Sequence, residues 1–167
     1  MTHHEVKKKA AGEGTALVIT RELDAPREKV WKAWAEPELV KLWWGPKPFT
    51  APVIKIDFRV GGKYLFDMRS PEGKDYWSTG VYRDIKAPER IVMTDSFADE
   101  KGNVVPATHY DMGTALPLEL LLTVTFQDLG GKTRPTLKHE GFPPGQDKDL
   151  AKEGWTTSLD KLAESLE

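Results

Sequence analysis

The fold class follows from residues 118–166, which read LELLLTVTFQDLGGKTRPTLKHEGFPPGQDKDLAKEGWTTSLDKLAESL. Apolar and polar residues alternate over Leu118–Gln127, and this period of two predicts a half-buried strand. A two-glycine turn leads into a shorter strand over Thr133–His139, where Pro135 favours a sheet edge or a bulge. The inward face of the first strand is predicted to hold Leu118, Leu120, Leu122, Val124 and Phe126.

A long helix is predicted after these two strands, over about Gln146–Leu166. Its apolar residues recur at helical spacing, which places one apolar stripe along a single face of the helix. Glu153 lies off that stripe. A sheet that keeps one face for such a helix forms a two-layer α+β domain. The stripe consists of Trp155, Leu159, Leu162 and Leu166.

The chain ahead of this region predicts further strands and two short helices. Alternation predicts a first strand near residues 17–23, and two prolines then favour short helices over about 26–35 and 38–44. Residues 99–117 show no period and predict a long connection, a kind of loop that is often functional. Strands separated by glycine or proline turns are predicted near residues 54–59, 63–69, 76–85 and 90–97.

Composition indicates a single domain without thiol chemistry. The chain has 167 residues, 39% of them hydrophobic, and no cysteine, which excludes disulfides and thiolate metal sites. Residues 1–14 are polar and lack an apolar period, so we predict a disordered arm ahead of one domain over residues 15–167. The 24 basic and 26 acidic residues argue against a nucleic-acid or membrane-coating protein. Without a signal or a membrane-spanning stretch, we expect a cytoplasmic protein.

Several short motifs, taken in order, resemble a known family. They include the runs TRELDAP (residues 20–26), VWKAW (30–34), WWGP (43–46), VGG (60–62) and LLLTVTF (120–126). Together with the Gly154-Trp155 pair, they make the chain similar to the SRPBCC superfamily over about Ala16 to Leu166. Within it, the closest branch is the one named after the activator of heat-shock protein 90 ATPase.

The resemblance implies a fold and a range of functions. The fold is the helix-grip, also called START-like or Bet v 1-like, in which a curved antiparallel sheet holds the last helix over a hydrophobic cavity. Relatives bind lipids, sterols, hormones or polyketides, some are cyclases or dehydratases, and the eponymous domain acts on a chaperone. We expect this protein to differ from the eponymous activator in having no second, separate chaperone-binding domain.

Aromatic and methionine side chains are the candidates for the cavity lining, because ligand pockets are lined mainly by such groups. They come from the inward faces of the predicted strands, the second short helix, the long connection and the last helix. The alternative is that these side chains simply fill the core. The candidates are Trp44, Tyr64, Phe66, Met68, Trp77, Met93, Phe97, His109, Tyr110, Met112 and Trp155.

Catalytic and metal-binding patterns are weak in this sequence. His109 with Asp111 on the long connection could move a proton at the cavity mouth, and the His139-Glu140 pair is a weaker candidate. For both histidines the favoured alternative is a residue without a catalytic role, His109 on the loop surface, and we assign no catalytic residue. The four histidines lack metal-ligand spacing, so we expect no metal and no cofactor. Strand carboxylates such as Asp67 are predicted to lie on solvated faces or in cross-strand pairs.

Three functions remain open at this level. The first is binding of a small hydrophobic molecule, of lipid, sterol or aromatic polyketide type, between the sheet and the last helix. The second is a protein-interaction module that acts on a chaperone or another protein. The third is a cyclase or dehydratase that uses the cavity. We expect no nucleic-acid or membrane partner.

Overall fold

A seven-stranded antiparallel sheet and a long C-terminal helix form the two layers of the protein. The computed structural model describes residues 16–112, 116–143 and 145–167, so the predicted arm over residues 1–14 lies outside the described residues. The elements are β1 (Leu17–Thr20), α2 (Arg27–Ala35), α3 (Pro37–Val40), β2 (Thr50–Ile56), β3 (Lys63–Arg69), β4 (Asp75–Lys86), β5 (Arg90–Ala98), η1 (Ala107–Tyr110), β6 (Leu120–Asp128), β7 (Thr133–Glu140) and α4 (Gln146–Ser165).

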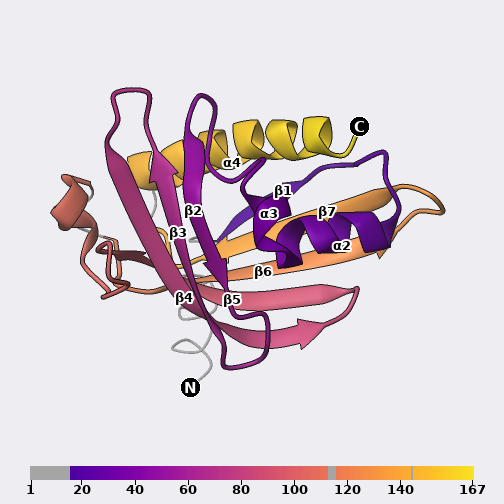
Figure 1. Cartoon of the computed structure of the whole chain (residues 1–167), viewed down its shortest axis with the longest axis horizontal. Coiled ribbons are helices and arrows are strands. Elements are labelled where there is room, and N and C mark those ends of the chain that lie inside the picture. The colour runs from indigo at the N-terminus through magenta and orange to yellow at the C-terminus, as the bar shows by residue number, and fades with distance from the viewer. Residues whose placement is uncertain (1–15, 113–115, 144) are drawn as a thin grey trace, which may run out of the picture.

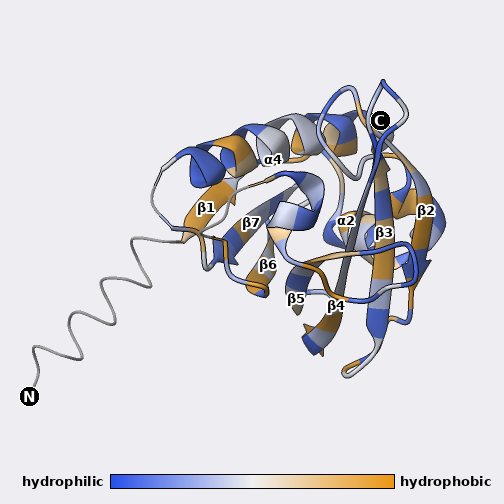
Figure 2. Cartoon of the chain, turned by 90° about the vertical axis from the view of Figure 1, so that its left-hand side faces the viewer, coloured by the Kyte–Doolittle hydropathy of each residue, from blue (hydrophilic) through white to orange (hydrophobic). Residues whose placement is uncertain are grey.

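The sheet is curved, and α4 lies over its hollow side. The strands follow the order β1-β7-β6-β5-β4-β3-β2, and every pair of neighbours is antiparallel. Figure 1 shows α4 running along the sheet with the short α2 and α3 beside it. In the view turned by 90°, the strands form an arc from β1 to β2 with α4 across its open side (Figure 2). The predicted α+β helix-grip fold is confirmed.

Strand β7 lies inside the sheet, so the predicted edge position of Pro135 is wrong. It pairs with β1 on one side and with β6 on the other. The carbonyl of Pro135 accepts the backbone N–H of Arg21 at 3.3 Å, just beyond the end of β1 at Thr20. Pairing with β7 resumes in the same register at the bridge between Leu23 and Thr133. The N and C=O of a strand residue face the same neighbour, so the donor that proline lacks leaves a gap opposite Arg21, and the regular ladder of β1 ends there.

The inward alternation predicted for β6 is confirmed from Leu122 onward but fails at its start. Leu122, Val124 and Phe126 are buried, whereas Leu118 is 57% exposed. The strand begins only at Leu120, so Leu118 belongs to the loop that enters the sheet. A side chain that precedes the strand is not part of the pleated backbone, so the direction in which it points does not follow the alternation of the strand.

The apolar stripe of α4 packs on the sheet and on the short helices. Leu159, Leu162 and Leu166 are buried, while Trp155 is half-buried. Ser158, also buried, donates its hydroxyl to the carbonyl of Trp43 at 2.9 Å. This bond ties α4 to the turn after α3 and satisfies a polar group inside the core.

Gly80 allows strands β4 and β5 to approach closely. A Cβ on this residue would lie 1.9 Å from the carbonyl oxygen of Thr94 and 2.7 Å from the ring of Tyr64. The same carbonyl accepts the hydroxyl of Tyr64 at 2.7 Å. Burial, and then the nearby Asp95 carboxylate, hold the pKa of Tyr64 well above its usual value, so this phenol stays protonated and donates.

Asp67 is fully buried, so its predicted place on a solvated face is wrong. It faces away from the inward residues of β3, but large side chains lie opposite it on both neighbouring strands, Val53 and Trp77. Burial, followed by the neighbouring Asp75 carboxyl, raises the pKa of Asp67 to about 7. The Arg69 guanidinium, 3.9 Å away, opposes this rise only in part.

The helices of the described residues do not include one that is both long enough and apolar enough to cross a membrane.

Candidate functional site

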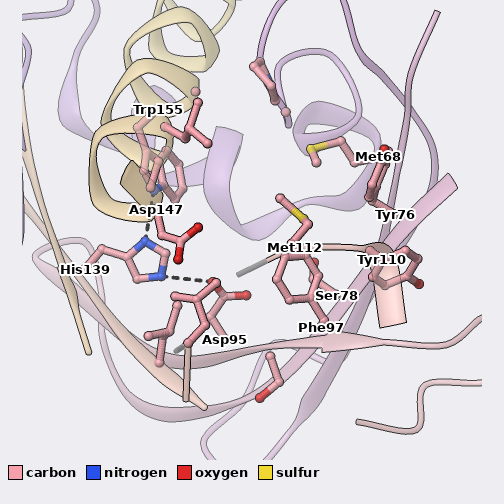
Figure 3. Close-up of a pocket in the computed structure, with 18 of the residues that line it drawn as sticks. Met68, Tyr76, Ser78, Asp95, Phe97, Tyr110, Met112, His139, Asp147 and Trp155 are labelled. Atoms are coloured by element: carbon pink, nitrogen blue, oxygen red, sulfur yellow. Dashed lines mark hydrogen bonds and ion pairs between the residues drawn. The ribbon is translucent and has the colours of Figure 1, made fainter. Parts of the chain in front are cut away.

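A cavity of about 710 Å³ lies between the hollow side of the sheet and the N-terminal half of α4. Figure 3 shows side chains from β3, β4, β5, η1, β7 and α4 converging on it. The residues around it include Trp44, Met68, Tyr76, Ser78, Asp95, Phe97, Tyr110, Met112, Leu118, His139, Phe142, Asp147, Leu150 and Trp155.

Aromatic rings stand on both the sheet side and the helix side of the cavity wall. The ring of Tyr110 lies 5.4 Å from that of Tyr76 and 5.6 Å from that of Phe97, measured between centroids. On the helix side, Trp44 and Trp155 meet edge to face at 5.5 Å. Such a wall offers a large, rigid apolar surface to a ligand.

The wall at Trp44 is held in place by α4. Lys161 donates its ammonium to the carbonyl of Trp44 at 3.4 Å and to that of Phe49 at 3.0 Å. Burial lowers the pKa of Lys161 from its ordinary value, although the bonded carbonyls stabilise its charge. The turn that carries Trp44 is therefore fastened to the helix that closes the cavity.

Tyr110 combines a place in the wall with a structural bond. Its hydroxyl donates to the carbonyl of Ala98 and accepts the backbone N–H of Trp77 at 3.2 Å. Trp77 and Ala98 are register partners in β4 and β5, so the phenol is inserted into the ladder between these strands. Burial raises the pKa of Tyr110, which keeps its donor proton in place.

The polar centre of the cavity is a chain of three side chains from three elements. The indole N–H of Trp155 on α4 donates to Nδ1 of His139 on β7 at 3.1 Å. Nε2 of the same imidazole lies 2.9 Å from Oδ2 of Asp95 on β5 (Figure 3). Because an indole can only donate, Nδ1 must be the acceptor; the proton is then on Nε2, which donates to Asp95.

The sheet register brings Asp95 and His139 together. Strand β6 separates β5 from β7, and Asp95 pairs with its Leu120 while His139 pairs with its Leu122. The contact therefore runs diagonally across β6, on the hollow side of the sheet. Phe142 packs edge to face on the imidazole at 4.8 Å and covers it from the loop that leads to α4.

The structure brings about half of the predicted site residues to this cavity. It is lined by Trp44, Met68, Phe97, Tyr110, Met112 and Trp155. That these residues bind a ligand stays a prediction, but their common location agrees with the cavity that the sequence led us to expect.

The other predicted site residues lie elsewhere, which corrects their expected location. Tyr64, Phe66 and Met93 are buried in the core farther along their strands, where only about 10 Å³ of void remains beside the last two. Trp77 alternates with Tyr76 and Ser78, which line the cavity, so it belongs to the other face of β4. His109 is exposed on η1 and does not line the cavity.

Asp95 is the main site residue that the sequence analysis missed, and His139 was undervalued. The alternation of inward and outward residues along β5 and β7 could have pointed to both of them. Asp95 stands between Met93 and Phe97, and His139 follows Leu137 in the inward register of β7. A polar residue in an inward register is informative because burying it requires a partner.

Within residues 16–112, 116–143 and 145–167, no group of three or more histidine or acidic side chains is arranged to hold a metal ion.

Comparison with known proteins identifies a family and a set of similar structures for this chain. A family model described as "Activator of Hsp90 ATPase homolog 1-like protein" matches residues 24–167. No protein with a curated description matches the chain by sequence. Many solved structures match, several of them over nearly the whole chain.

Three of these structures illustrate the similarity. A crystal structure of a protein from Nitrosomonas europaea is 28% identical with a TM-score of 0.72, and the match covers 92% of this chain and 94% of that one. A crystal structure of a Chromobacterium violaceum protein is 27% identical with a TM-score of 0.75, over 91% of this chain and 96% of the other. A solution structure of an Arthrobacter aurescens protein is 27% identical with a TM-score of 0.75, over 92% and 87%.

Proposed function

Since the chain belongs to the family of Activator of Hsp90 ATPase homolog 1-like proteins, we propose that it uses the cavity under α4 to bind a small, largely hydrophobic molecule. The observation that carries this proposal is the cavity itself. Its volume of about 710 Å³ lies within the range of small-molecule sites. Its walls are mainly aromatic and aliphatic, with one hydrogen-bonded polar centre, which is the usual design of such sites.

The distribution of exposed apolar side chains favours binding of a ligand in the cavity and not docking of a protein on a surface patch. Of the large ones exposed among the described residues, Met112, Leu118 and Leu150 line the cavity. The others are spread over separate elements, where single exposed apolar residues need no partner. These others are Val18, Leu42, Val60 and Val104.

A direct test of this proposal measures ligand binding with the cavity open and with the cavity filled by a substitution. We would screen the protein by native mass spectrometry for a co-purified molecule and titrate it with sterols, flavonoids, fatty acids and an environment-sensitive dye. Ser78→Trp places an indole in the cavity wall and is expected to abolish binding. Thr125→Trp, on an exposed strand position, is the matched control and is expected to bind like the wild type.

Two outcomes would contradict the proposal. If no ligand binds, or if Ser78→Trp binds as well as the control, the cavity is not the site. Stimulation of a purified Hsp90 ATPase by a protein that binds none of these ligands would instead favour the interaction module. The chaperone partner and the cytoplasmic location stay predictions.

A further inference from the structure

We propose that the preferred ligand is an apolar molecule with a protonated amine, and that Asp95 is the residue that selects it. This inference rests on the proposed function, because it concerns the same cavity. It names a ligand class that neither the family nor the size of the cavity defines. Three features carry it: the accessible polar atom, the charges around the cavity, and the aromatic wall.

The accessible polar group of the Trp155–His139–Asp95 chain is the carboxylate. Both imidazole nitrogens of His139 are engaged, and its side chain is only 7% exposed. The side chain of Asp95 is 25% exposed and lines the cavity. A ligand that reaches this point therefore meets a hydrogen-bond acceptor, since a carboxylate held by an imidazole N–H has no proton to donate.

The other charged groups around the cavity add to this preference. Besides Asp95, the carboxylates of Asp111 and Asp147 line it, and Figure 3 shows Asp147 reaching from α4 toward the same polar centre. Within the described part of the chain, Lys74 is the one lysine or arginine that lines the cavity. Its side chain is exposed, and its ammonium lies 5.1 Å from the ring centroid of Tyr76. A negative head group would be repelled at the cavity floor, and a positive one attracted.

The aromatic wall suits a cation as well as an apolar body. Phe97 lies two residues after Asp95 on β5, the ring of Tyr110 packs against it, and the ring of Trp155 faces them from α4. The faces of such rings attract a cation electrostatically, most strongly where water is excluded. An ammonium at Asp95 would therefore find a charge-assisted hydrogen bond and ring faces in one place.

The test compares three ligands with one apolar body and different head groups: naphthylethylamine, naphthylethanol and naphthylacetate. Binding to the wild-type protein would be measured by titration calorimetry at neutral pH. We expect the amine to bind about 10- to 100-fold more tightly than the alcohol, the gain typical of a charged over a neutral hydrogen bond. The carboxylate is expected to bind most weakly of the three.

Variants identify the residue responsible. Asp95→Asn keeps an oxygen that can accept from His139 but removes the charge, and it is expected to lower affinity for the amine about 10- to 100-fold while leaving the alcohol nearly unchanged. Glu153→Gln makes the same charge change on the exposed side of α4, outside the cavity lining, and is expected to change neither.

The outcomes separate this inference from the proposed function. If the three ligands bind alike, or if Asp95→Asn does not affect the amine, the cavity binds apolar molecules but Asp95 does not select them, and the inference is overturned. If none of the three binds, and the wider ligand panel does not bind either, both proposals fall. The comparison of head groups needs only the wild-type protein, so it stands even if Asp95→Asn is unstable.

Discussion

The indole of Trp155 and the imidazole of His139 join the last helix to the last strand through a single hydrogen bond of 3.1 Å. Trp155 also stacks on Trp34 at 6.1 Å, so one side chain connects the polar centre of the cavity to the aromatic core. The position of α4 over the sheet, the tautomer of His139 and the orientation of Asp95 are therefore coupled. Of the four predictions below, the first and third concern this network and the cavity wall, the second concerns a buried carboxyl group on the other face of the sheet, and the fourth concerns the core.

The first prediction is that His139 is the Nε2–H tautomer, because its Nδ1 accepts from Trp155. Nitrogen-15 NMR of the imidazole should show an unprotonated Nδ1 in the wild-type protein. Trp155→Phe removes the donor and is expected to lower the free energy of unfolding by about 1–3 kcal/mol. Urea denaturation measures that change.

The matched control for this bond is Trp44→Phe. It makes the same change in the other wall of the cavity, where no hydrogen bond of the indole to the described part of the chain is lost. An Nδ1–H tautomer in the wild type, or equal losses in the two variants, would contradict the role given to the Trp155 donor.

The second prediction concerns Asp67, whose pKa of about 7 in the folded protein lies well above the ordinary value near 4. A raised pKa means that the folded state holds the proton more tightly than the unfolded state. The stability from this group is therefore fully present below about pH 4 and is lost as the pH rises through about 7. The buried carboxylate destabilises the fold at alkaline pH.

Asp67→Asn keeps this group neutral at every pH. The variant should exceed the wild type in free energy of unfolding by about 2–4 kcal/mol near pH 8, and the difference should shrink toward pH 5. Denaturation at both pH values measures this. Asp57→Asn, at an exposed carboxylate paired with Arg59, is the control and should show little pH-dependent difference. A gain in Asp67→Asn that is equal at both pH values would refute the assignment.

The third prediction is that Tyr110→Phe loosens the end of the β4–β5 ladder. The phenol bridges Trp77 N–H and the carbonyl of Ala98, and its loss leaves both groups without that partner. We expect about 1–3 kcal/mol of lost stability and faster hydrogen exchange at the Trp77 amide. Tyr76→Phe changes the neighbouring ring, 5.4 Å away, in the same manner and should leave this amide as protected as in the wild type.

The fourth prediction concerns the stripe of α4. Leu159 is 1% exposed, and Leu159→Ala is expected to lower the free energy of unfolding by about 2–5 kcal/mol because it leaves a cavity in the core. Glu153→Ala, on the exposed face of the same helix, should change stability by less than about 0.5 kcal/mol. Similar losses in thermal or urea unfolding would mean that the helix faces the sheet differently.

Local periodicity explains which parts of the fold were predictable. The stripe of α4 and the alternation of β6 record which side of each element avoids water, and this property depends on neighbours only a few residues apart. Pro135 shows where the local rule ends. A proline disfavours an internal strand in general, but here it only interrupts the pairing opposite Arg21, which resumes at Leu23 and Thr133, and no residue within β7 reports that.

Asp67 and Met93 illustrate the same limit for burial. Alternation assigned Asp67 to the outer face correctly, yet its neighbours on β2 and β4 exclude water there. Met93 faces inward as predicted, but it lies where the aromatic core is filled rather than where the cavity opens. Whether an inward residue meets a neighbour or an empty space depends on how far the opposite layer extends.

The sequence by itself determined the element types, their order, the inward faces and the family resemblance, because each is written in spacing along the chain. Only the tertiary structure decided that β7 is internal, which inward residues line the cavity, and that Trp155, His139 and Asp95 form one chain of hydrogen bonds. Asp95 and His139 are 44 residues apart and meet diagonally across β6. Their contact depends on strand register and sheet curvature, which arise from packing the whole chain and not from any one segment.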